Sequence, residues 1–173
     1  PQVMSQRLPQ RIDLLAMADA GRTLEGRIEV TSLDRVLPLL HDTEGVLDVV
    51  MRMDTDPDGT RFLAGTIEGR IQLLCQRCLE PVVLPLNLAF RLGLVADQEE
   101  ASRLTPRYEP LIVTAEPTRL ADIVADEVLL AMPQVPVHPE QEKCLAPQTG
   151  TDSPEETQRE NPFAVLAKLK DQL

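Results

Sequence analysis

The sequence predicts an α+β domain built around a curved antiparallel β-sheet with helices packed on it. Apolar and polar residues alternate over 61–74 and again over 82–95, which predicts two strands joined as an antiparallel hairpin. Apolar residues at helical spacing over 119–132 predict a helix. A length of 173 residues with 43% hydrophobic content suits one domain with its own core.

The N-terminal part combines a lead-in segment, a strand and a helix. Residues 1–22 show no long period, and we expect them to form a lead-in segment that docks on the domain. Residues 23–30 read as a short strand. A capping box at 31–34 then predicts a helix over 32–40, although Pro38 disfavours its second half.

One further strand precedes the hairpin, and several residues within the hairpin affect its shape. Alternation over 46–53 predicts another strand, and the turn formers of 54–59 join it to the next one. Pro85 lacks a backbone N–H, so we expect the second hairpin strand to have an edge position there. Three glycines of the hairpin are predicted to allow bends or bulges: Gly65, Gly69 and Gly93.

An acidic stretch at 97–100 follows the hairpin and leads to a short apolar strand at 111–114. The helix over 119–132 is predicted to end where Pro133 follows Met132. Its apolar stripe is predicted to consist of Leu120, Ile123, Val124 and Leu130.

These elements predict a core domain over 23–144. The composition then shifts towards Pro, Glu, Gln and Thr, which predicts a flexible acidic linker over 145–160. A short C-terminal helix is predicted over 161–173, since an N-cap asparagine and a proline open it. So short a helix is marginal alone, so we expect Phe163 and Leu166 to anchor it on a partner.

The charge balance argues against a stand-alone nucleic-acid reader. Lys and Arg number 17 against 28 Asp and Glu, a net charge of −11, whereas counterion release from phosphates needs a basic face. Aromatic side chains for base stacking are scarce, with no Trp, one Tyr and three Phe. Composition therefore favours a protein partner, in particular a basic one.

A local basic patch is still compatible with this composition, because most of the cations are arginine, which binds phosphate well. The hypothesis is an RNA-binding patch near the hairpin turn, made of Arg70, Arg77 and Arg91. The alternative is that these arginines are solvated residues beside Glu68 and Glu80.

Cys75 and Cys78 form a C-x-x-C motif in the hairpin connection. This spacing lets two thiolates reach one tetrahedral Zn²⁺ ion, and Cys144 with His138 would complete a closed structural site. His41 competes as the fourth ligand. Three other interpretations stay open, namely a redox pair, ordinary reduced cysteines and a disulfide.

Nothing in the sequence identifies an enzyme. It contains no phosphate-binding glycine loop and no nucleophile elbow, and two histidines allow few acid–base schemes. No apolar run approaches the length that spans a bilayer and no basic-then-apolar leader opens the chain, so we expect no membrane association or secretion.

Six segments occur in an order that resembles the bacterial large ribosomal RNA subunit accumulation protein (YceD) family, which also has plastid relatives. They are CQRCLEP at 75–81, YEP at 108–110, DEVLLAMP at 126–133, VPVH at 135–138, the cysteine at 144 and NPFAVL at 161–166. The resemblance covers roughly residues 5–170. The family's C-x-x-C and His…Cys elements fall on Cys75, Cys78, His138 and Cys144.

The resemblance implies a cytoplasmic, non-enzymatic factor needed for synthesis, processing or stability of large-subunit (23S) ribosomal RNA. With the acidic charge, it implies binding to large-subunit ribosomal proteins or to the pre-50S particle. Two alternatives are a redox or zinc-dependent C-x-x-C regulatory protein and an enzyme of ribosomal RNA processing.

Overall fold

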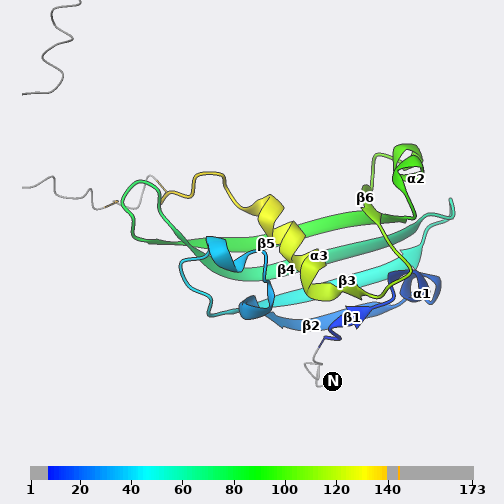
Figure 1. Ribbon diagram of the computed structural model, residues 1–173, viewed down its shortest axis with the longest axis horizontal. Helices are drawn as coiled ribbons and strands as arrows, with labels where there is room; N and C mark the ends of the chain where they lie inside the picture. The colour runs from blue at the N-terminus through cyan, green and yellow to red at the C-terminus, as the bar shows by residue number, and fades with distance from the viewer. Residues whose placement is uncertain (1–7, 140–143, 145–173) are drawn as a thin grey trace, which may run out of the picture.

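A five-stranded sheet forms the centre of the computed structural model, which describes residues 8–139 and 144 (Figure 1). Its order is β2-β3-β4-β5-β6. The strands are β2 (Thr23–Glu29), β3 (Val46–Thr55), β4 (Arg61–Leu74), β5 (Pro81–Val95) and β6 (Glu109–Ile112). Strands β2 to β5 form an antiparallel meander, while β6 runs parallel to β5. The predicted α+β class is confirmed.

The predicted hairpin is the longest feature of the sheet, and its register runs without a break from Leu74 opposite Pro81 to Phe62 opposite Gly93. This register has no bulge at the three glycines, so that half of the expectation is wrong, while bends at these positions stay a prediction. These glycines instead leave space for side chains on neighbouring elements. A Cβ at Gly69 would lie 2.6 Å from Leu47 Cδ2, and one at Gly93 would lie 2.6 Å from Leu104 Cδ2.

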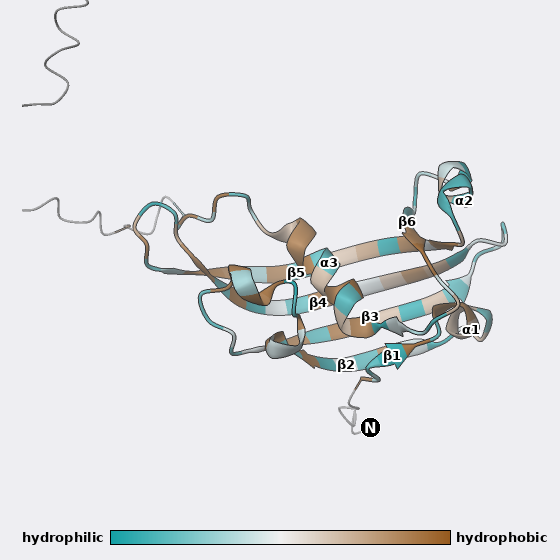
Figure 2. Ribbon diagram, in the orientation of Figure 1, coloured by the Kyte–Doolittle hydropathy of each residue, from teal (hydrophilic) through white to brown (hydrophobic). Residues whose placement is uncertain are grey.

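The two faces of the sheet differ because side chains alternate along each strand. Figure 2 shows this alternation as bands of hydropathy along β3, β4 and β5. The face that carries the core presents Leu47, Val49, Met51, Met53, Leu63, Ile67, Ile71, Leu73, Val82, Leu86, Phe90 and Leu92. The opposite face, which we call the exposed face, carries mainly polar residues together with Val46 and Val50.

Short elements cover the core face. Helix α1 (Leu14–Asp19) is capped by the Asp13 side chain, which accepts from Ala16 N at 3.0 Å. Strand β1 (Arg11–Ile12) pairs with β7 (Thr118–Arg119), so the described part of the lead-in segment docks on the domain. Leu14 is only 1% exposed, so this segment belongs to the core.

The predicted helix over 32–40 is wrong. Two 3-10 helices, Val30–Ser32 and Leu37–Leu39, stand in its place. Pro38 has no N–H for a helical hydrogen bond, and the Asp34 side chain accepts from Arg119 instead of completing a capping box. Leu33 and Val36 are nevertheless fully buried, so the apolar pattern marked the core correctly.

Helix α3 (Leu120–Ala131) confirms the helix predicted there, with Met132 at its C-cap before Pro133. Its buried stripe runs over Val124 and Val128, which are four residues apart. Leu130 points away from that stripe and is 74% exposed, so its assignment to the stripe is wrong. A second short helix, α2 (Gln98–Arg103), forms from the acidic stretch.

Two remaining predictions concern other parts of the chain. Within residues 8–139 and 144, no helix has both the length and the apolar character needed to cross a bilayer. The predicted linker over 145–160 and the predicted C-terminal helix, with Phe163 and Leu166, lie outside the described residues.

Candidate metal centre

The turn between β4 and β5 holds Cys75 and Cys78. Cys75 N donates to Glu80 O at 2.9 Å, and Leu79 N donates to Cys75 O at 2.9 Å. Leu79 adopts a φ of 61°, which lets the chain turn back tightly after Cys78. Cys75 is buried and Cys78 is half-buried. This compact turn holds the two thiols near one another.

A segment that follows α3 returns to this turn. Gln76 N donates to Pro136 O at 2.8 Å, which aligns the returning chain with the turn. The approach places the imidazole of His138 and the thiol of Cys144 beside the two turn cysteines, and the ligand atoms of all four residues lie within 4.8 Å of one another. The structure thus brings together four residues that span 69 positions of the chain.

Three of the six separations between these ligand atoms fit a tetrahedral zinc ion. Cys75 Sγ lies 3.8 Å from Cys144 Sγ, and His138 Nδ1 lies 3.4 Å from both Cys78 Sγ and Cys144 Sγ. Zn–S bonds of about 2.3 Å at tetrahedral angles require sulfur atoms about 3.8 Å apart, and a shorter Zn–N bond brings nitrogen slightly closer. The donor set and its dimensions therefore suit Zn²⁺.

The histidine is oriented for metal binding through Nδ1. Its Nε2 lies 3.0 Å from the carbonyl oxygen of Pro81, which can only accept a hydrogen bond. In the neutral ring, Nε2 therefore carries the proton and the Nδ1 lone pair points at the sulfur atoms. This arrangement is the usual outer-sphere support for a metal-bound histidine.

The electrostatics of the cluster shift two of its three thiols towards the thiolate, whereas burial raises the pKa of Cys78. Burial opposes ionisation of Cys75, but the backbone N–H groups of Cys78 and Arg77 outweigh it and lower the pKa of that thiol to about 5. The pKa of Cys144 is also lowered, against burial, because Arg77 Nε donates to its sulfur at 3.0 Å. The pKa of His138 is raised, first by Cys75 and then by Cys144. Negative charge gathered in this way holds a proton unless a metal replaces it.

His138, and not His41, lies with the three cysteines in this cluster. His41 N donates to Gln72 O at 2.8 Å, and its ring is not among the clustered ligand atoms of the described residues. The surroundings of the C-x-x-C motif also differ from those of a thioredoxin-like pair, because a strand precedes it and another follows, whereas the redox pair opens a helix. The bound metal itself stays a prediction.

The three arginines of the hypothesised RNA-binding patch lie in two places. Arg70 and Arg91 are both on the exposed face, opposite Pro85 and Ala64 respectively. The six residue-to-residue steps from Pro85 to Arg91 separate them by about 20 Å along the strand. Arg77 lies in the turn, where its guanidinium bonds to Cys144. RNA contact by these residues stays a prediction.

Sequence reasoning missed a second polar centre at the opposite end of the hairpin. The Asp56 side chain is 5% exposed and accepts from the N–H groups of Asp58 and Thr60, both at 2.9 Å. Tyr108 Oη donates to it at 3.0 Å, and Arg107 forms an ion pair with it. Burial raises the pKa of Asp56, but the Thr60 and Tyr108 bonds outweigh it and the pKa is lowered.

This second centre ties the β3–β4 turn to the residues before β6. The Tyr108 ring stacks on Phe62 with a centroid separation of 5.6 Å, and Arg107 lies 4.9 Å above the Tyr108 ring. No local pattern links Asp56 with Tyr108, because 52 positions separate them. The hydrogen-bonding and charged groups of this centre satisfy one another, so we interpret it as a structural link between the turn and the residues before β6.

Comparison with known proteins adds an independent observation. The family model described as "Large ribosomal RNA subunit accumulation protein YceD" matches residues 63–170, a range that contains all four clustered ligands. The large ribosomal RNA subunit accumulation protein YceD of Haemophilus influenzae is 32% identical over 170 residues, covering 95% of this chain and 97% of that protein. No solved structure matches.

Proposed function

This chain belongs to the family of the large ribosomal RNA subunit accumulation protein YceD, and we propose that it is a non-enzymatic factor that supports large-subunit (23S) ribosomal RNA. It would act on synthesis, processing or stability of that RNA. The observation that carries the proposal is 32% identity across 95% of the chain to a relative whose name states ribosomal RNA accumulation. Such a role places the protein in the cytoplasm, where bacterial ribosomal subunits assemble.

Binding, not catalysis, is the mode of action that we propose. Three thiolates and one imidazole fill all four positions of a tetrahedral ion, so a metal there would have no open position for a reacting water. The site suits a structural Zn²⁺ ion that joins the residues around His138 to the hairpin turn. The role that we propose for this cross-linked turn is that of a rigid binding surface.

The partner that we propose is a basic large-subunit ribosomal protein or the pre-50S particle that contains it. The chain has a net charge of −11. Seven of the twelve arginines in the described residues already pair with carboxylates, which leaves few cations for phosphate. An acidic surface attracts a basic protein more readily than it attracts RNA.

The test is complementation in a bacterium that lacks its own relative. We expect the deletion to lower the ratio of large-subunit to small-subunit ribosomal RNA, and the full chain to restore it. The double variant Cys75→Ser, Cys78→Ser should restore less, whereas His41→Ala should restore as well as the unchanged chain. A deletion strain with an unaltered RNA ratio would contradict the proposed function.

A second experiment separates protein from RNA contacts. A tagged copy of the chain is sedimented through a sucrose gradient of lysate, with and without ribonuclease. We expect co-migration with large-subunit precursors, and retention of a ribosomal protein after ribonuclease treatment. Loss of every partner on ribonuclease treatment would show that the contact is made through RNA.

A further inference from the structure

Strand β5 has an outer edge that no other strand fully covers. It pairs with β4 over nearly its whole length, but with β6 only from Leu92 to Val95. An unpaired edge presents backbone donors and acceptors that another chain can use, and proteins usually block such edges. Within residues 8–139 and 144, no strand pairs with this edge ahead of Leu92.

The direction of the backbone groups on this edge follows from two hydrogen bonds. Pro81 O accepts from His138, and Val95 O accepts from Val113 N at 2.8 Å. The backbone N–H and C=O groups of the odd-numbered residues of β5 therefore point outward, away from β4. Pro81 and Pro85 occupy such positions and have no N–H, which blocks the first part of the edge. The next outward residues are Asn87 and Ala89, both exposed.

Asn87 and Ala89 form what we call the open edge. Neither residue takes part in a backbone hydrogen bond outside its own sheet among the residues that the structure describes. The open edge ends where β6 begins to pair with Leu92. A short additional strand therefore fits between the blocked part of the edge and β6, in line with β6.

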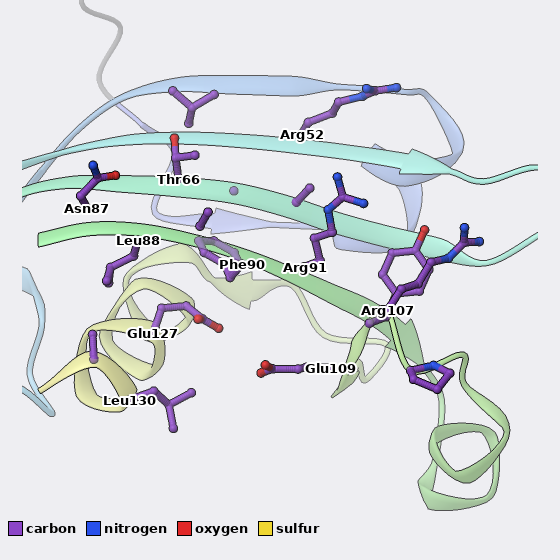
Figure 3. A pocket seen from close by; sticks show the side chains of 17 residues that line it. Arg52, Thr66, Asn87, Leu88, Phe90, Arg91, Arg107, Glu109, Glu127 and Leu130 are labelled. Carbon is purple, nitrogen blue, oxygen red and sulfur yellow. The ribbon is translucent and has the colours of Figure 1, made fainter.

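A groove of about 860 Å³ extends from the exposed face of β3 and β4 across the open edge of β5 to α3 and β6 (Figure 3). Leu88 lines its β5 side and Leu130 lines its α3 side. Leu130 is the large apolar residue of α3 that the core does not cover. The groove thus combines unpaired backbone groups with an apolar contact surface, as strand-adding peptide sites do.

Two carboxylates face this groove on its α3 side. Figure 3 shows Glu127 from α3 and Glu109 from β6 directed into the same space. In the described part of the chain neither forms an ion pair, since every salt bridge there uses other carboxylates. Burial raises the pKa of Glu127, and the charge of Glu109 raises it further. A cation placed between the two would stabilise both.

The arginines that line the groove lie away from these carboxylates. Arg52 pairs with Asp54, and Arg107 pairs with Asp56 and Asp58. Arg91 is an odd-numbered residue of β5, so its side chain lies on the exposed face, whereas the neighbouring Leu88 lies on the face towards α3. The α3 side of the groove is therefore acidic and apolar.

We propose that the open edge binds an extended, basic segment of a partner protein as an added β-strand. Alternate side chains of that segment would face α3, with Lys or Arg between Glu109 and Glu127 and an apolar residue against Leu130. The other side chains would lie beside Arg91 on the exposed face and be neutral or acidic. This inference rests on the proposed function, because it names the part of a basic ribosomal protein that this factor would hold.

The direct test uses the full chain and a fluorescent synthetic peptide in which Lys, Leu and Lys alternate with Thr. We expect saturable binding by fluorescence anisotropy. Ala89→Pro removes one outward N–H without breaking the β4–β5 pairing and should weaken binding about tenfold. Val83→Pro is the matched control, because it changes an outward residue between two existing prolines and outside the groove.

A second pair of variants keeps the test valid if Ala89→Pro disturbs folding. Glu127→Lys should also weaken binding about tenfold, since it replaces the attraction for lysine by repulsion. Glu68→Lys, on the exposed face, should leave binding unchanged. A peptide with Glu in place of both lysines should not bind.

Several results would overturn the proposal: no binding of the basic peptide, undiminished binding by both Ala89→Pro and Glu127→Lys, or binding of the Glu peptide as strong as that of the basic peptide. A chain that sediments as a dimer and becomes a monomer on Ala89→Pro would show that a second copy occupies the edge. RNA binding lost in the same variants would show that RNA occupies it. If the full chain restores ribosomal RNA in the deletion strain but binds no peptide, only this inference fails; failed restoration counts against the proposed function itself.

Discussion

The two ends of the β3–β4–β5 meander are held in place by different chemistry. At each end a hairpin turn is tied to a segment that is distant in the sequence. At the Asp56 end, a buried carboxylate accepts hydrogen bonds from its own turn and from Tyr108. At the Cys75 end, three sulfur atoms and one imidazole nitrogen converge on a common point.

The difference lies in whether the groups satisfy one another. The Asp56 carboxylate has donors on all sides and an arginine partner, so that end is complete with protein atoms alone. Thiolates gathered around a histidine repel one another unless a cation joins them. We therefore expect the Asp56 end to depend on hydrogen bonds and the Cys75 end to depend on a metal.

The largest expected effect is loss of the metal at the Cys75 end. A strong chelator should lower the midpoint of thermal unfolding of the unchanged chain by about 10 °C, because the residues around His138 lose their attachment. Cys78→Ser should have a similar low midpoint and no longer respond to the chelator. His41→Ala is the control and should behave like the unchanged chain. A midpoint that the chelator does not move would break the comparison between the two ends.

The next effect is at the Asp56 end. Asp56→Asn keeps the size of the side chain but removes the charge that pairs with Arg107, so the unfolding midpoint should fall by about 5 °C. Asp58→Asn is the matched control, since that carboxylate is 71% exposed and should matter little. Calorimetry of both variants with and without chelator should show that neither loses its response to the metal.

The pH dependence of the Asp56 end follows from its lowered pKa. The usual pKa of this carboxyl group is 3.8, and folding lowers it. The carboxylate therefore stabilises the folded state at pH values above 3.8, and this contribution is lost as the pH falls through the lowered pKa of the folded state. The difference in stability between the unchanged chain and Asp56→Asn should therefore shrink as the medium becomes more acidic than 3.8. Urea unfolding across the acid range measures it, and a constant difference would contradict the assignment.

The two ends also differ in how much space surrounds a glycine of the hairpin. Gly69, towards the Cys75 end, has a φ of +155°, and a Cβ there would meet both Leu47 and the carbonyl of Val46, at 2.6 and 3.2 Å. Gly93, towards the other end, would meet only the tip of the Leu104 side chain. Gly69→Ala should lower the free energy of unfolding by ~2 kcal/mol and Gly93→Ala by less than half of that. Equal losses in urea unfolding would show that Leu104 cannot move.

The smallest effect is expected for an exposed ion pair near the Asp56 end. Arg61 pairs with Asp19 at 2.6 Å, but both side chains are about half exposed. Arg61→Gln should shift the unfolding midpoint by less than about 2 °C, because water and salt screen such pairs. A shift as large as that of Asp56→Asn would mean that this end relies on its surface charges as well.

Much of the sheet could be predicted from the sequence because alternation along β3, β4 and β5 is a local property. The bounds of β4 agree with the prediction, and the edge position of Pro85 is confirmed by the absence of a second partner strand there among the described residues. The helix predicted over 32–40 does not form, because Pro38 lacks an N–H and the Asp34 side chain accepts from the distant Arg119. Tertiary contacts of this kind overrode a local capping signal.

The two tied ends differ in how visible they are in the sequence. Cysteines are few in this chain, so Cys144 was the one candidate to join the C-x-x-C pair of Cys75 and Cys78 as a third thiol. The choice of His138 over His41 needed the return of the chain after α3 to be known. Asp56 is one of 28 acidic residues, and its partner Tyr108 is recognisable only in the folded chain.

Native mass spectrometry of the purified full chain tests the central claim most directly, because it counts metal ions in the folded protein. We predict one zinc ion per chain, retained in His41→Ala and lost in His138→Ala and Cys144→Ser. A folded chain that carries no metal after purification without chelators and in the presence of zinc would contradict the account.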